Sequence, residues 1–119
     1  MVLFYTIDGE PYPDTEEGKL QFYKDKAATP PIRRSAVGNY LVSTVWLGLN
    51  HAFGNELPLI FETMIFNYDP IEKKVTDYLE LYCNRYHTKA EAIVGHYAAI
   101  ERASQLMRQN YSKCEDLIL

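Results

Sequence analysis

The chain has few of the features that would assign it to a specialised class. Its 119 residues carry 12 lysines and arginines against 16 aspartates and glutamates, and the only basic doublets are Arg33-Arg34 and Lys73-Lys74. Because phosphate contacts require clustered cations, the net charge of −4 argues against a nucleic-acid partner. No run approaches the ~20 apolar residues of a membrane-spanning helix, and no basic, apolar leader opens the chain. These absences predict a cytoplasmic protein without a membrane partner.

Cysteine and catalytic motifs are also scarce. Cys83 and Cys114 form no CxxC pair and have no metal-type spacing with the histidines, so we predict no metal site. A disulfide between them is one alternative, although two cysteines without a secretory leader are more often reduced. The phosphate loop, GxGxxG, GxSxG and HExxH patterns are missing, so no cofactor is predicted.

What the chain does contain is ordinary globular composition with an excess of aromatic residues. Hydrophobic residues make up 47% and charged residues 24%, which predicts one folded domain over residues 1–119. Ten tyrosines and five phenylalanines are present. Tyrosine is favoured at protein interfaces, but it is equally suited to half-buried sheets.

Hydrophobic patterning predicts an α+β fold in the order β-α-β-β-β-α. We expect strands at residues 2–7, 40–47, 59–66 and 78–86. One helix follows Asp14 as N-cap and ends before Pro30, and the other follows the capping box of Thr88 and Glu91 and runs to about residue 110. Sequential strands with short connections favour an antiparallel sheet, with both helices on one face of a two-layer sandwich. The residues expected to be buried on the helices are Leu20, Tyr23 and Ala27 on the first and Ile93, His96, Ile100, Ala103 and Met107 on the second.

The loop of residues 48–57 contains the first candidate, His51. An imidazole after a strand is well placed for catalysis or ligand binding, and Asn50, Phe53 and Asn55 could orient it or stack on a ligand. In the structural alternative, Asn50 and His51 shape the hairpin turn and Phe53 folds over the end of the sheet.

Glu62 is the second candidate, because a carboxylate is unexpected inside the apolar strand LIFETMIF. It is either paired or solvated, or its pKa is raised for function. Arg85, Arg33 and Arg34 are possible ion-pair partners, and Ser43 and Thr44 are possible hydrogen-bond partners. His96 is the third candidate, on the apolar side of the last helix, where a lone histidine is most often a hydrogen-bonded core residue. If His51, Glu62 and His96 met, they would form a site for acid–base chemistry.

The two hairpin strands are apolar on both of their sides. Helices can cover only one face of such a sheet, so the other face would expose more apolar surface than a monomer usually tolerates. We therefore expect a homodimer formed through a sheet face.

Three blocks of the chain resemble a family of small, functionally uncharacterised proteins encoded mainly by bacteriophages and prophages. The family pattern joins VSTVWLGLDHxF, PLIFETMVF and RYSTxxEAxxGH, and the present chain has VSTVWLGLNHAF, PLIFETMIF and RYHTKAEAIVGH. Asn50 stands where the family often has aspartate, and the segment between Asn67 and Arg85 is longer than usual. The resemblance brings no established reaction, cofactor or binding residue.

The resemblance implies a bacteriophage or prophage accessory protein that acts in the cytoplasm of a bacterial host cell. Without a catalytic motif, we expect it to act by binding, either modulating a host or defence protein or sequestering a ligand. The alternative is a small enzyme or ligand-binding domain that uses His51, Glu62 and His96. The residues expected to bind are Trp46, Asn50, His51, Phe53, Asn55, Glu62 and Arg85.

Overall fold

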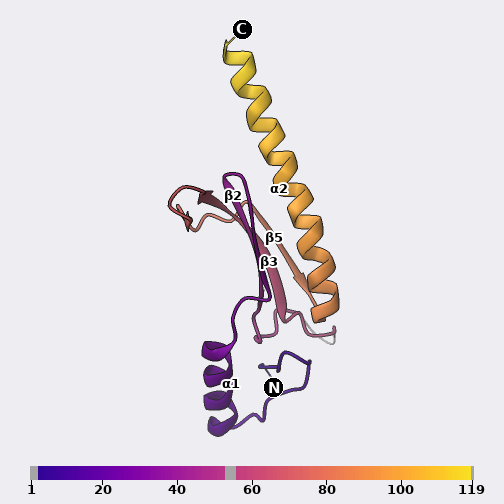
Figure 1. Cartoon of the computed structure of the whole chain (residues 1–119). Helices are drawn as coiled ribbons and strands as arrows, with labels where there is room; N and C mark the ends of the chain where they lie inside the picture. The colour runs from indigo at the N-terminus through magenta and orange to yellow at the C-terminus, as the bar shows by residue number, and fades with distance from the viewer. Residues whose placement is uncertain (1–2, 53–55, 119) are drawn as a thin grey trace.

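The computed structural model describes residues 3–52 and 56–118, with residues 111–118 described by their backbone only. The strands form one antiparallel sheet in the order β1-β2-β3-β4, and β5 pairs with β3 beside β4. A helix packs on this sheet, so the predicted two-layer α+β fold is confirmed (Figure 1). The elements are α1 (Glu16–Ala28), β1 (Arg33–Val37), β2 (Tyr40–Trp46), β3 (Phe61–Asp69), β4 (Lys74–Val75), β5 (Tyr82–Tyr86) and α2 (Lys89–Ile118).

The helical layer consists of α2, whereas α1 lies beyond one end of the sheet (Figure 1). The expectation that both helices share a face therefore fails for α1. This helix buries Phe22 and Gly18, while Leu20 is 62% and Tyr23 is 60% exposed, contrary to the predicted apolar side. The reason is that the apolar residues of α1 do not gather in a stripe that could lie along a sheet. Its N-cap is Thr15 rather than Asp14, and the Thr15 hydroxyl accepts from the Gly18 N–H at 3.0 Å.

The N-terminal segment supports α1 without forming the predicted first strand. Phe4 and Tyr5 make only isolated bridges, to Leu49 and Pro11 respectively. The ring of Phe4 stacks on Phe22 with 4.3 Å between centroids, so the segment packs between α1 and the end of the sheet. Its apolar residues are therefore used for packing against an aromatic cluster instead of for strand pairing.

The long helix α2 begins as the capping box predicts. Thr88 accepts from the Glu91 N–H at 3.1 Å, and the Glu91 carboxylate accepts from the His87 N–H at 3.4 Å. The helix continues to Ile118, beyond the predicted end near residue 110, and its C-terminal part extends past the sheet (Figure 1). The residues of α2 that are fully buried against the sheet are Ala92, His96, Ala99 and Ala103. The three alanines in this set have small side chains, which allow a close helix–sheet approach.

The strand register separates two faces of the sheet. The β2 residues Tyr40, Val42, Thr44 and Trp46 are buried, and they pair in β3 with Asn67, Ile65, Thr63 and Phe61. Because side chains alternate along a strand, the intervening residues project from the opposite face. The predicted strand over residues 78–86 is shorter than expected, since β5 begins at Tyr82. Strand β3 instead extends beyond its predicted end, to Asp69.

Candidate functional site

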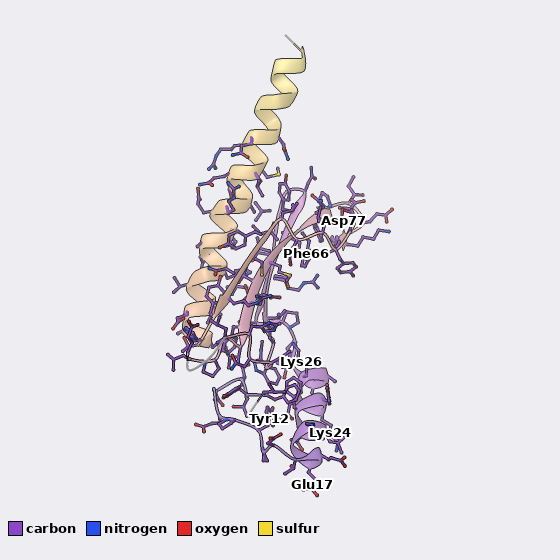
Figure 2. The ribbon with its side chains drawn as sticks, turned by 180° about the vertical axis from the view of Figure 1, so that it is seen from behind. Tyr12, Glu17, Lys24, Lys26, Phe66 and Asp77 are labelled. Carbon is purple, nitrogen blue, oxygen red and sulfur yellow. The ribbon has the colours of Figure 1, made fainter. Side chains whose placement is uncertain are left out.

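The sheet face turned away from α2 combines apolar side chains with charged ones. We call it the open face. Its members, from the register of β1, β2, β3 and β5, are Arg34, Ala36, Leu41, Ser43, Val45, Glu62, Met64, Phe66, Cys83 and Arg85. Figure 2 shows Phe66 on the side of the sheet away from α2, with Lys26 at the end of α1 nearest the sheet. No helix of the described chain covers this face.

The open face is organised in rows that cross the strands. One row is apolar and contains Ala36, Leu41 and Phe66. The next contains Arg34, Ser43, Met64 and Cys83, and the third contains Val45, Glu62 and Arg85. The face therefore changes from apolar to charged along the strand direction.

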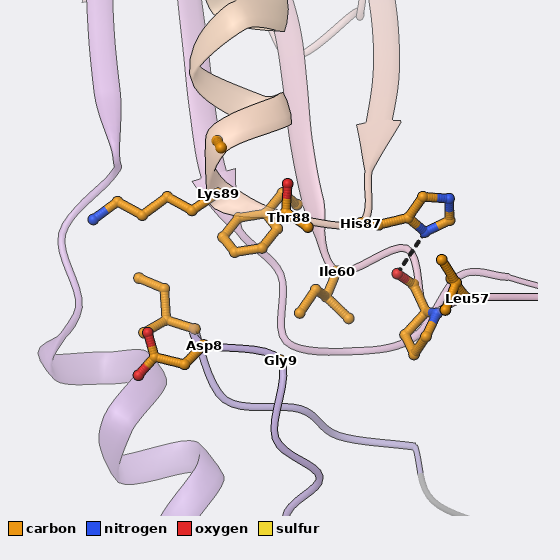
Figure 3. Close-up of a pocket in the computed structure, with 11 residues that line it drawn as sticks. Asp8, Gly9, Leu57, Ile60, His87, Thr88 and Lys89 are labelled. Atoms are coloured by element: carbon orange, nitrogen blue, oxygen red, sulfur yellow. Dashed lines mark hydrogen bonds between the residues drawn. The ribbon is translucent and has the colours of Figure 1, made fainter.

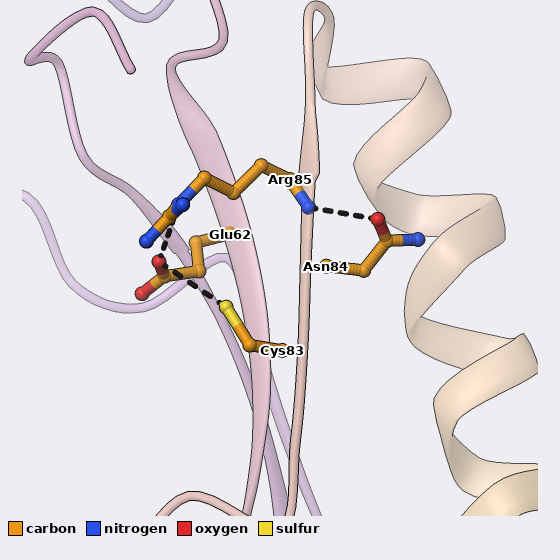
Figure 4. A network of polar contacts seen from close by, with 4 residues as sticks. All are labelled: Glu62, Cys83, Asn84 and Arg85. Atoms are coloured by element: carbon orange, nitrogen blue, oxygen red, sulfur yellow. Dashed lines mark hydrogen bonds and ion pairs between the residues drawn. The ribbon is translucent and has the colours of Figure 1, made fainter. Parts of the chain in front are cut away.

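Glu62 is held in this apolar strand by an ion pair. Its Oε2 accepts from the Arg85 Nε at 2.9 Å, across the β3–β5 pairing, while the Glu62 residue is only 6% exposed (Figure 4). The Cys83 thiol lies 3.6 Å from the same oxygen, and burial, together with the Glu62 charge, raises the pKa of Cys83. Arg85 was one of the partners expected from the sequence. The ion pair supplies the partner that a buried carboxylate requires.

Lys26 places a second cation near Glu62. Its ammonium donates to the Trp46 carbonyl oxygen and lies 5.6 Å from the centroid of the indole ring. Burial lowers the pKa of Lys26, and the charge of Glu62 opposes that shift. Within the described chain Lys26 forms no ion pair, so its charge remains uncompensated by direct contact.

The apolar part of the open face is less bare than the sequence pattern suggests. Leu41 is 4% exposed, and Val45, Met64 and Phe66 are half-buried. Part of the cover comes from the chain itself, because the ring of Tyr78 packs edge-on against Phe66 with 6.1 Å between centroids. The apolar surface expected from the sequence is therefore partly covered by the chain itself.

His96 belongs to the opposite face of the sheet. Its Nε2 lies 2.8 Å from the Ser35 Oγ, and its Nδ1 lies 2.7 Å from the Thr44 Oγ1. The Thr44 hydroxyl also bonds the Thr63 hydroxyl at 2.6 Å, and His96, Thr44 and Thr63 are all fully buried. Burial, and to a lesser extent the charge of Arg33, lowers the pKa of His96. Both ring nitrogens therefore have a hydroxyl partner, and burial favours the neutral form of the ring.

In the 48–57 loop, the amide of Asn50 organises the backbone. Its Oδ1 accepts from the Ala52 N–H at 2.8 Å and from the Leu59 N–H at 3.2 Å. The His51 N–H donates to the Leu59 carbonyl at 3.1 Å, and His51 is half-buried. These contacts fit the alternative in which this pair of residues shapes the loop. Phe53 and Asn55 lie outside the described residues.

Trp46, expected as a binding residue, is a core residue. It is 2% exposed, its ring meets Phe22 edge-on at 5.7 Å, and its indole N–H donates to the Tyr5 carbonyl at 3.1 Å. The side chain therefore joins α1 to the end of the sheet. The Trp46 side chain is therefore not accessible to a binding partner.

The structure does not bring His51, Glu62 and His96 together. Glu62 and His96 project from opposite faces of the sheet, with the backbone layer between them. Among the described residues, no group of three or more His, Cys, Asp and Glu side chains is placed to hold a metal ion. The combined acid–base site considered from the sequence is therefore absent from the described part of the chain.

A pocket of about 450 Å³ lies at the N-terminus of α2 (Figure 3). Asp8, Leu57, Ile60 and Lys89 contribute to its walls. Its other polar groups already have partners: His87 Nδ1 lies 2.9 Å from the Pro58 carbonyl oxygen, and Thr88 caps the helix. The pocket shows no pairing of a nucleophile with a base.

Comparisons with protein-family models, with curated proteins and with solved structures found no match. Within residues 3–52 and 56–118, no helix is both long enough and apolar enough to span a membrane.

Two features were missed by reasoning from the sequence. The first is Lys26, which is not among the candidate residues named from the sequence. The second is the hydroxyl network around His96, formed by Ser35, Thr44 and Thr63. Both depend on the relative placement of segments distant in sequence. The one available signal was the alternation of β2, in which Thr44 shares a side with Val42 and Trp46.

Proposed function

We propose that the chain is a bacteriophage- or prophage-type accessory protein that acts by binding in the cytoplasm of a bacterial host. Its role would be to modulate a host or defence protein, without catalysing a reaction. The block resemblance supports the origin, and the open face supports the mode of action. A homodimer formed through the same face is the competing use of this surface, and it is tested separately.

The observation that carries the proposal is the sheet face that no helix of the described chain covers. Antiparallel sheets often leave one face to water, but such faces are then mainly polar. Here Leu41, Val45, Met64 and Phe66 lie on that face beside the ion pair of Glu62 and Arg85. Apolar surface with a few fixed charges is typical of protein interfaces.

The enzymatic alternative receives no support from the geometry. It required a carboxylate and two imidazoles in one site, whereas Glu62 is neutralised by Arg85 and His96 is enclosed between α2 and the sheet. Loop residue His51 has neither as a hydrogen-bond partner in the described chain.

The test compares two matched double variants in affinity capture from the bacterial host. Ala36→Gln/Met64→Gln makes the open face polar, and Val94→Gln/Ala98→Gln does the same on the outer side of α2, where both residues are exposed. We expect the first variant to lose partners that the wild type and the second variant retain. Equal capture by all three proteins would refute binding through the open face.

Light scattering after size-exclusion chromatography tests the homodimer separately. A dimer at micromolar concentration that dissociates in Ala36→Gln/Met64→Gln supports it. A wild-type monomer under the same conditions removes the dimer from the proposal and leaves the capture experiment to decide the rest.

A further inference from the structure

We infer that the open face docks an acidic protein segment, one that combines carboxylates with apolar side chains. This inference rests on the proposed binding function and specifies the chemistry of the partner. Three observations support it: the cations on and beside the open face, the absence of carboxylate partners for two of them among the described residues, and the distance between them.

The charge of the open face is opposite to that of the whole chain. The chain has a net charge of −4. On and beside the open face, however, the cations Lys26, Arg34 and Arg85 accompany the single carboxylate Glu62. A second carboxylate, Glu80, lies in the segment before β5, close enough to the open face for its charge to act on Cys83. A cationic area on an acidic protein attracts an anionic partner and disfavours a basic one.

Two of these cations have no carboxylate partner in the described chain. Among the described residues Arg34 has no ion-pair or side-chain hydrogen-bond partner, and it is exposed. It lies on the open face because its neighbour Arg33 points the other way, donating to the Tyr97 hydroxyl of α2 at 3.0 Å. Lys26 bonds only the Trp46 carbonyl. Each cation is therefore free to meet a carboxylate of a partner.

Arg85 offers a third contact after pairing with Glu62. The ion pair uses its Nε, and the Arg85 side chain is 39% exposed. The terminal nitrogens of the guanidinium have no partner among the described residues. An arginine fixed in this way presents its remaining donors in a set orientation, which suits a carboxylate.

The spacing of the cations favours an extended contact over a single bound ion. Arg34 lies on β1 and Arg85 on β5, with β2 and β3 between them. Three strand spacings separate β1 from β5 by about 14 Å. In the row of Arg34 the face presents the uncharged Ser43 and Met64, and in the next row Glu62 lies beside Arg85. A partner segment crossing the strands would place carboxylates at its ends and apolar side chains in its middle.

Peptide display against the purified full chain tests this inference. The probe is a random 12-residue peptide library, selected in parallel on the wild type and on Ala36→Gln/Met64→Gln. We expect peptides that are lost on the variant to be enriched in aspartate and glutamate together with leucine or phenylalanine. Their affinity should fall as NaCl is raised, because exposed charge pairs are screened by salt.

Arg34→Glu and Arg102→Glu then serve as a matched pair of charge reversals. Both arginines are exposed, and Arg102 lies on α2, where its side chain donates to the Gln105 side-chain oxygen at 3.3 Å. We expect Arg34→Glu to weaken binding of the selected peptides by about tenfold and Arg34→Gln by about threefold, with Arg102→Glu unchanged. Arg85 is unsuitable for this purpose, since its removal would leave Glu62 buried without a partner.

The outcomes separate the inference from the function on which it rests. Neutral or basic peptides that bind through the open face would overturn the acidic partner and leave the binding function standing. Self-association through the face would overturn it in favour of a second copy of the chain. If no selected peptide depends on the open face and host capture is equal for all variants, both proposals are refuted.

Discussion

Replacing His96 with glutamine should remove a specific part of the acid sensitivity of the fold. His96 is fully buried between α2 and the sheet, with Ser35 at 2.8 Å and Thr44 at 2.7 Å. A glutamine amide can donate to one hydroxyl and accept from the other, and it carries no charge at any pH. The variant therefore retains polar contacts and removes only the titration.

The sign and size of the pH effect on stability follow from the protons that His96 binds in the folded and the unfolded protein. Burial lowers the pKa of His96 in the folded protein below its ordinary value of 6.5, so between those two values the unfolded chain binds more protons. The free energy of unfolding then falls as the pH is lowered below about 6.5, by at most about 1.4 kcal/mol per pH unit. Between pH 7.5 and pH 5.0 the contribution of His96 is at most about 2 kcal/mol. For a domain with about 5–15 kcal/mol of stability, this loss is readily measured.

The assay is urea unfolding monitored by the fluorescence of the single tryptophan. Trp46 is 2% exposed, so its emission shifts when the core opens. Wild type and His96→Gln are compared at pH 7.5 and pH 5.0, and the other titrating groups, common to both proteins, cancel in the difference. We expect the wild type to lose more stability than the variant, by at most about 2 kcal/mol. Equal losses would show that His96 does not resist protonation in the fold.

Substitutions at three further contacts are measured by the same unfolding assay. Gly95→Ala should destabilise the fold by about 1–3 kcal/mol, because the added Cβ would lie 2.2 Å from the Tyr86 ring. This clash outweighs the better helix propensity of alanine, which is worth about 1 kcal/mol. A variant more stable than the wild type would contradict this prediction. Arg85→Ala should lower the free energy of unfolding by about 1–3 kcal/mol, because it leaves the Glu62 side chain, which is only 8% exposed, without its partner. The loss is smaller than for a fully buried ion pair because the Arg85 side chain is itself 39% exposed. Adding Glu62→Gln to Arg85→Ala should restore most of that loss, and failure to do so would mean that the buried charge is not its cause. Asn50→Ala should cost about 1–2 kcal/mol through the two backbone N–H groups left without an acceptor, whereas Asn50→Asp, which keeps the oxygen, should unfold close to wild type.

The elements that sequence patterns located best are those with strong local signals. Strand β2 lies within the predicted range 40–47, and Thr88 caps α2 as its capping box indicates. Alternation along a strand and side-chain capping depend only on residues a few positions apart. They are therefore visible without knowledge of the rest of the fold.

The features that sequence patterns misplaced depend on distant segments. Phe4 and Tyr5 have strand-forming side chains but pack around Phe22 of α1 instead. Trp46 was expected at a binding surface, yet α1 and the N-terminal segment bury it. In both cases the competing partner is an aromatic cluster assembled from three parts of the chain, and local propensity carries no information about it.

The sequence by itself determined that the chain has an α+β fold with a carboxylate inside an apolar strand. It also supplied Arg85 among the candidates that could pair with Glu62. The tertiary structure decided which candidate does so, because only the β3–β5 register places Glu62 opposite Arg85. It also separated Glu62 from His96, since strand alternation sends their contacts to opposite faces once α2 covers one side. Because α2 covers only one side of the sheet, the other side remains as the open face, with its cations that lack a carboxylate partner.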